Sequence, residues 1–99
     1  MTSVKLKINN QAADWYKNEL KEVKTNYVRF FPRYGGVGGL IPGFSIGINF
    51  DEPENILASF EAKGITFYIE QSDAWYFDGK TELNIEFDEK MKEPQFNYS

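Results

Sequence analysis

The residues best suited to recognising another molecule lie on one predicted strand, Tyr27–Tyr34. Two arginines, Arg29 and Arg33, alternate there with aromatic residues, so on an extended chain they share one face. Guanidinium groups beside aromatic rings can bind single-stranded nucleic acid, and they also cover sheets and interfaces by stacking. We favour the second use, because the net charge is −4 and affinity for a nucleic-acid backbone comes mostly from positive charge. Binding of single-stranded nucleic acid or another ligand by this face stands as the alternative hypothesis.

A glycine-dense connection follows this strand. Five glycines occur from Gly35 to Gly43, and each costs more backbone entropy on folding than another residue would. A chain tolerates that cost where the backbone needs a positive φ angle or where something approaches it closely, and the sequence leaves both explanations open. We predict an interaction surface that joins the arginine-bearing face to the start of this loop: Arg29, Phe31, Arg33, Tyr34, Gly35, Gly36 and Val37.

The 99 residues contain no cysteine and no histidine. Disulfides, thiolate or imidazole metal ligands, cysteine nucleophiles and histidine acid–base chemistry are therefore excluded. The remaining candidates for catalysis are Asp51, Glu70, Asp78, Tyr34 and Lys80. Their spacing does not pair an acid with a base, and the acidic turn 51–55 lacks the ligand pattern of an EF-hand. We therefore predict a protein that is not an enzyme and that holds no metal or cofactor.

One helix and six or seven short strands must position these residues. A strand over Val4–Ile8 precedes a helix from Asn10 to Val23, which Asn9 or Asn10 caps and whose apolar residues recur at helical spacing. Alternation of apolar and polar residues predicts the other strands. They cover Tyr27–Tyr34, Phe44–Phe50, Ile56–Ala62, Ile65–Tyr68 and Leu83–Phe87.

Short connections and an acidic tail complete the chain. Lys63 and Gly64 predict a hairpin turn, and Ser72–Phe77 predicts a helical turn capped by Ser72. Asp78 and Gly79 are a further turn signal. We expect the tail Glu89–Ser99 to be partly ordered, with Phe96 docked on the sheet.

The length predicts one domain over residues 1–99. The elements predict a mostly β fold with an N-terminal helix and a curled mixed or antiparallel sheet. No apolar run is long enough for a bilayer and the first residues do not resemble a signal peptide, so we expect a cytoplasmic protein with no membrane partner.

Charge is distributed unevenly along the chain. Residues 1–50 carry seven Lys/Arg against three Asp/Glu, a net +4, whereas residues 51–99 carry four against twelve, a net −8. We expect the two halves to lie side by side and partly neutralise each other. The alternative is a dipolar surface that orients a partner or a second copy of the chain.

The order of these segments resembles the HesB/IscA-like family of A-type iron–sulfur cluster carriers, in particular its short, cysteine-poor bacterial members. The resemblance rests on the glycine-rich loop after Tyr34 and on the segments Pro42–Phe44 and Trp75–Gly79. It implies a HesB-like pseudo-barrel. The family's three cluster cysteines would fall at Val37 and at two positions after Phe96, and none is present.

The resemblance without the cysteines predicts a non-catalytic accessory module that acts through protein partners, such as the iron–sulfur assembly machinery. Related carriers form homodimers or tetramers, so self-association is also expected. The edge aromatics Phe31 and Tyr68 are the predicted contact surfaces. A monomer in which these rings are half-exposed is the alternative.

Overall fold

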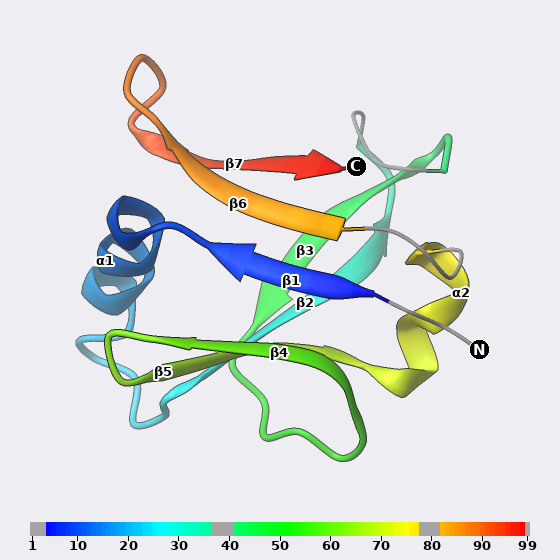
Figure 1. The fold of residues 1–99 in the computed structure, drawn as a ribbon, viewed down its shortest axis with the longest axis horizontal. Helices are drawn as coiled ribbons and strands as arrows, with labels where there is room; N and C mark the ends of the chain where they lie inside the picture. The colour runs from blue at the N-terminus through cyan, green and yellow to red at the C-terminus, as the bar shows by residue number, and fades with distance from the viewer. Residues whose placement is uncertain (1–3, 37–40, 78–81, 99) are drawn as a thin grey trace.

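The computed structural model describes residues 4–36, 41–77 and 82–98, which form seven strands, two α-helices and one 3-10 turn (Figure 1). The predicted mostly β class with an N-terminal helix is confirmed, with a second short helix in addition. In chain order the elements are β1 (Lys5–Ile8), α1 (Asn10–Glu19), β2 (Tyr27–Tyr34), β3 (Phe44–Asn49), β4 (Ile56–Ala62), β5 (Ile65–Glu70), η1 (Gln71–Asp73), α2 (Ala74–Phe77), β6 (Glu82–Asp88) and β7 (Glu93–Tyr98).

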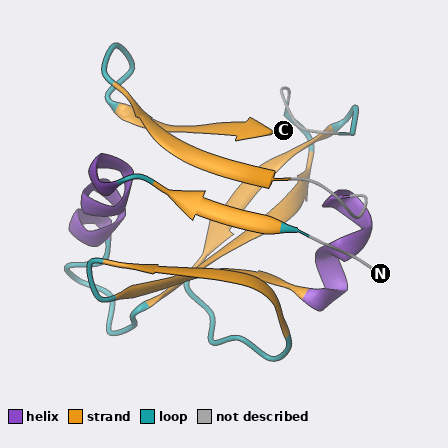
Figure 2. Ribbon diagram, in the orientation of Figure 1, coloured by secondary structure: helices purple, strands orange, loops and turns teal. Residues whose placement is uncertain are grey.

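The strands form two sheets, with the orders β1-β6-β7 and β3-β2-β5-β4 (Figure 2). Each sheet is mixed: β1–β6 and β2–β5 are parallel, and the other neighbours are antiparallel. The sheets approach each other where β1 passes β4. The expected mixed pairing is therefore confirmed, but the described strands form two open sheets and not the single pseudo-barrel that the resemblance implied.

The core lies between the two sheets and under α1. Val28 and Phe30 of β2 are fully buried, on the strand face opposite to that of Arg29 and Phe31. The Phe30 ring stacks on Phe67 with ring centroids 6.0 Å apart, and Tyr16 of α1 meets both rings edge-on. Buried aromatic rings remove more apolar area from water than aliphatic side chains do, so this cluster contributes strongly to the packing of α1 on the β3-β2-β5-β4 sheet.

Helix α1 begins where the cap predicted and ends earlier than expected. The Asn9 Oδ1 accepts a hydrogen bond of 2.9 Å from the Ala12 amide, which satisfies one free donor of the first turn. The helix ends at Glu19, so its predicted extension to Val23 is wrong. Val23 is 37% exposed, because beyond Leu20 no core surface remains for an apolar helix face to cover.

The C-terminal half differs from the prediction at two places. The tail is a full strand, since β7 pairs with β6 and sets Phe96 opposite Ile85. Phe96 meets the Phe30 ring at 5.8 Å, so its predicted docking is confirmed. Ser72 lies inside η1, whose N-cap is Glu70, and therefore does not cap a helix. The predicted turn at Asp78 and Gly79 lies outside the described residues.

None of the helices in residues 4–36, 41–77 and 82–98 combines the length and the apolar character that crossing a bilayer requires.

Candidate protein-binding site

On the arginine-bearing face of β2, Arg29 is held in an ion pair, whereas Arg33 is exposed. The Arg29 Nη2 lies 2.7 Å from the Asp73 Oδ2, and its guanidinium lies 5.6 Å from the Phe31 ring centroid. Burial works to lower the pKa of Arg29, but the hydrogen bond and the charge of Asp73 outweigh it, so the pKa is raised. Arg33 is exposed at the far end of the strand. Of the two arginines on which the nucleic-acid hypothesis depends, only Arg33 is therefore available to contact a ligand.

The face around Arg29 is covered by the turn at residues 51–55. The Tyr68 hydroxyl donates to the Asp51 carbonyl, and the Glu70 carboxylate accepts from the amides of Glu54 and Asn55 at 2.7 and 2.8 Å. Tyr68 is fully buried, so its predicted role as an exposed edge aromatic is wrong. Glu70, a candidate for acid–base chemistry, instead holds this turn to β5. Asp78 and Lys80 lie outside the described residues.

Phe31 is half-buried because a glycine on the next strand accommodates its ring. Gly47 stands opposite Phe31 in the β2–β3 register. A Cβ atom at Gly47 would lie 2.8 Å from the Phe31 Cζ, closer than real Cβ contacts allow. This strand glycine therefore permits a close approach of a ring. Phe31 contributes mainly to the packing of β2 on β3.

The glycines after β2 shape the hairpin connection. Gly35, Gly36 and Gly43 have φ angles of +103°, +82° and +87°, which a residue with a Cβ rarely adopts. The Gly35 amide donates to the Gly43 carbonyl at 2.6 Å, and the Ser45 hydroxyl donates to the Gly35 carbonyl at 3.1 Å. Turn geometry therefore accounts for these glycines. Val37 lies outside the described residues.

Exposed aromatic side chains gather where the β2–β3 hairpin meets α2. Tyr34 is 84% exposed and Trp75 is 55% exposed, and the Phe44 ring lies between them. Its centroid is 5.6 Å from that of Tyr34 and 5.5 Å from that of Trp75, both edge-on. We call Tyr34, Phe44 and Trp75 the aromatic end. In Figure 1 the end of the hairpin and α2 lie on the side of the molecule away from α1.

Of this cluster, the sequence predicts only Tyr34 as part of the interaction surface. Trp75 supports the family resemblance, and the alternation of β3 places Phe44 on the apolar face of that strand. The register sets Tyr34 opposite Phe44, and this pairing follows from the local hairpin that joins β2 to β3. The contact between Phe44 and Trp75 joins β3 to α2, and no local pattern reveals it.

The donor set does not fit an iron–sulfur cluster. Such clusters are held by thiolates, with histidine as the main substitute, and the 99 residues contain neither. Within the described residues no group of three or more carboxylates converges in a way that could hold a metal ion. The chain therefore offers no thiolate or imidazole ligand for such a cluster.

The fold defines the class of protein, a cysteine-free chain with the fold of IscA. The crystal structure of IscA with its [2Fe-2S] cluster superimposes with a TM-score of 0.56 at 15% identity, covering 95% of this chain and 83% of that one. The solution structure of an Aquifex aeolicus protein gives a TM-score of 0.52 at 22% identity, covering 100% of this chain and 94% of that one. The HesB/IscA-like resemblance is thus supported at the level of the fold. No family model matches the chain.

Sequence similarity places the chain more narrowly. It is 46% identical to the Bacillus subtilis (strain 168) protein named pyruvate dehydrogenase inhibitor, over 92% of this chain and 95% of that protein. It is 33% identical to an uncharacterized protein of Staphylococcus saprophyticus, over 76% of this chain and 80% of that one. An uncharacterized protein of Staphylococcus haemolyticus is 32% identical over a similar span. The chain belongs to the family of these proteins.

Proposed function

We propose that this protein is a non-catalytic cytoplasmic protein that binds a pyruvate dehydrogenase and inhibits it. The observation that carries the proposal is the 46% identity, along almost the whole chain, to the Bacillus subtilis protein named for that inhibition. At this identity, over 92% of this chain and 95% of that protein, the two share a fold. The proposed partner differs from the iron–sulfur assembly machinery that the fold resemblance suggested.

The aromatic end is the surface that we assign to this contact. Binding hot spots are rich in Trp, Tyr and Arg, and here an exposed Tyr34 and an exposed Trp75 flank the Phe44 ring. Each ring already has an edge-on neighbour. Less side-chain freedom is then lost on binding, which favours affinity.

The test measures inhibition of a purified pyruvate dehydrogenase from the same source as the protein. The wild type is compared with a Tyr34→Ala/Trp75→Ala double variant. We expect the wild type to inhibit at stoichiometric excess, and the double variant to need roughly 30-fold more protein, since two hot-spot residues together account for about 2 kcal/mol or more. A Met91→Ala variant is the control, because Met91 is 66% exposed and lies between β6 and β7.

Two failures have different meanings. If the wild type neither inhibits the enzyme nor co-purifies with it, the proposed function is wrong. If the wild type inhibits and the double variant inhibits equally well, the function stands and the aromatic end is the wrong surface. Loss of inhibition in the Met91→Ala control would also remove the assignment to the aromatic end.

An accessory role in iron–sulfur cluster assembly through protein contacts is a second proposal, and the likeness of fold to IscA is what supports it. It is weaker, because the chain lacks every thiol with which that fold could hold a cluster. Incubation with iron and sulfide under reducing conditions tests whether the chain can hold a cluster without thiols. A stoichiometric cluster absorbance would contradict our conclusion that the chain has no cluster ligands. Self-association stays a prediction, which light scattering decides.

A further inference from the structure

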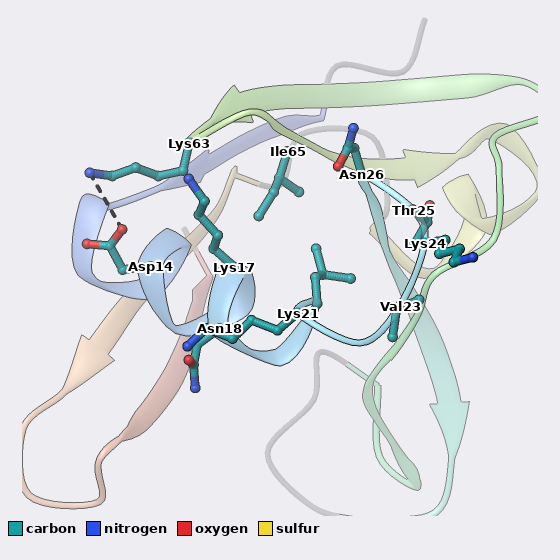
Figure 3. A pocket seen from close by; sticks show the side chains of 11 residues that line it. Asp14, Lys17, Asn18, Lys21, Val23, Lys24, Thr25, Asn26, Lys63 and Ile65 are labelled. Atoms are coloured by element: carbon teal, nitrogen blue, oxygen red, sulfur yellow. Dashed lines mark ion pairs between the residues drawn. The ribbon is translucent and has the colours of Figure 1, made fainter.

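A second recognisable site lies at the other end of the molecule from the aromatic end. The end of α1, the loop after it and the β4–β5 turn surround a hollow of about 580 Å³ (Figure 3). This volume lies in the range of small-molecule sites. The hollow shares no residue with the aromatic end, and its assignment is independent of the proposed function.

Positive charge is concentrated around the hollow. Four lysines line it, namely Lys17, Lys21, Lys24 and Lys63, against the single carboxylate of Asp14. The local net charge is therefore +3, whereas the whole chain carries −4 and the remaining residues −7. The hollow is thus a strongly positive site on a negative protein, the arrangement that raises the local concentration of an anion.

The acidic residues of the same segment are not among those that line the hollow. Residues 17–24 read KNELKEVK, and its lysines line the hollow whereas Glu19 and Glu22 do not. Lys17 and Lys21 stand four positions apart, where like charges on a helical turn repel each other. Among the described residues, none of the three lysines of this segment has an ion-pair partner. A bound anion would relieve this repulsion.

The fourth lysine stands at a strained position. Lys63 has a φ angle of +56° in the β4–β5 turn, where Asn, Asp or Gly is the usual choice. Its Nζ lies 3.5 Å from the Asp14 Oδ1, and Figure 3 shows the two side chains extended toward each other at the rim of the hollow. This pair joins the turn to α1 across the rim of the site.

Apolar side chains form the inner part of the hollow. Leu20 is 7% exposed and Ile65 is 3% exposed, and Val23, which is 37% exposed, adds further apolar surface. The early end of α1, which leaves Val23 without a core to cover, is what opens this surface. An apolar floor beneath a cationic rim suits an organic anion better than an inorganic one, because the organic part removes apolar area from water.

We propose that this lysine-lined hollow binds a small organic molecule that carries two or more phosphate or carboxylate groups. The charged groups contact the ammonium groups of Lys17, Lys21 and Lys24, and the organic part lies on Leu20, Val23 and Ile65.

Isothermal titration calorimetry at low salt tests the proposal with three probes: ATP, citrate and tripolyphosphate. ATP and citrate represent the phosphate and carboxylate classes, and tripolyphosphate carries charge without an organic part. We expect ATP or citrate to bind the wild type, and a Lys17→Gln/Lys21→Gln/Lys24→Gln variant to weaken that binding by roughly tenfold or more, as expected for the loss of several exposed charge pairs. Raising the salt to about 0.5 M should weaken it in the same direction.

A Lys5→Gln/Lys90→Gln/Lys92→Gln variant is the matched control. It removes the same number of positive charges at exposed positions outside the hollow, so it separates a local effect from one of net charge. Compared at about 0.1 M salt, where the Debye length is about 10 Å and distant exposed charges are screened, its affinity should stay within about twofold of the wild type. Circular dichroism confirms that both variants fold.

Three results overturn the proposal. The first is no binding of any probe at about 5 mM, a concentration at which even a weak site with a millimolar dissociation constant is mostly occupied. The second is an equal loss of affinity in the two triple variants, which would assign binding to net charge. The third is binding of tripolyphosphate but not of ATP or citrate, which would show that Leu20, Val23 and Ile65 do not contribute to binding.

Discussion

Replacing Arg29 with alanine tests whether this arginine stabilises the fold. Arg29 joins β2 to η1 through a contact of 2.7 Å to Asp73. The side chains of Arg29 and Asp73 are only 23% and 12% exposed, respectively. Truncation of Arg29 leaves the Asp73 carboxylate largely buried without its cation.

The expected cost follows from this burial. Breaking a fully buried ion pair by removing one partner costs about 3–5 kcal/mol, and an exposed pair contributes at most about 1 kcal/mol. The Arg29–Asp73 pair lies between these limits. The buried Nε of Arg29 has no hydrogen-bond partner within the described residues, which reduces what the arginine contributes. We therefore expect Arg29→Ala to lower the free energy of unfolding by about 2 kcal/mol, or the melting temperature by roughly 8–16 °C for a domain of this size.

Urea unfolding followed by tryptophan fluorescence measures the effect, with Arg33→Ala as the matched control. Arg33 is exposed on the same strand, so its removal should change the free energy of unfolding by no more than about 0.5 kcal/mol. A double-mutant cycle with Asp73→Ala isolates the contribution of the pair, which we expect to be about 1–2 kcal/mol. An Arg29→Ala variant as stable as Arg33→Ala, or a coupling energy near zero, would refute the structural role of this pair.

Three further predictions concern the packing of α1 and of the β2–β3 pair. Burial raises the pKa of Tyr16 above its usual range, so stability should fall as the pH rises above about 10, where the unfolded tyrosine ionises. Tyr16→Phe should make that fall shallower in alkaline unfolding curves. Gly47→Ala should lower the urea midpoint by an amount equivalent to about 1 kcal/mol, because its Cβ would meet Phe31, and Phe31→Ala should remove the penalty. Asn9→Ala should cost about 1 kcal/mol through loss of the helix cap, whereas an unchanged melting temperature would show that the Ala12 amide finds another acceptor.

The alternation of residues along the chain predicted the strands β1 to β6, whereas β7 lies in the tail, for which only partial order was expected. Val28 and Phe30 point into the core, Asn9 caps α1, and the turn of Lys63 and Gly64 joins β4 to β5 in an antiparallel pair. These features depend on interactions within a few residues, such as the period of a strand, the free amides of a first helical turn and the φ angles of a two-residue turn. The lack of thiol and imidazole ligands was likewise readable from composition.

The features that matter for recognition arise from contacts between distant segments. Asp73 reaches Arg29 across 44 positions, and this contact turned a predicted binding residue into a structural one. Trp75 approaches Phe44 and Tyr34 only because α2 packs beside the β2–β3 hairpin. The lysine-lined hollow exists only because the β4–β5 turn lies beside the end of α1. Periodicity shows which face of one element is turned toward the core. Which elements become neighbours depends on how the whole chain buries its apolar surface, and a short stretch of sequence does not contain that information.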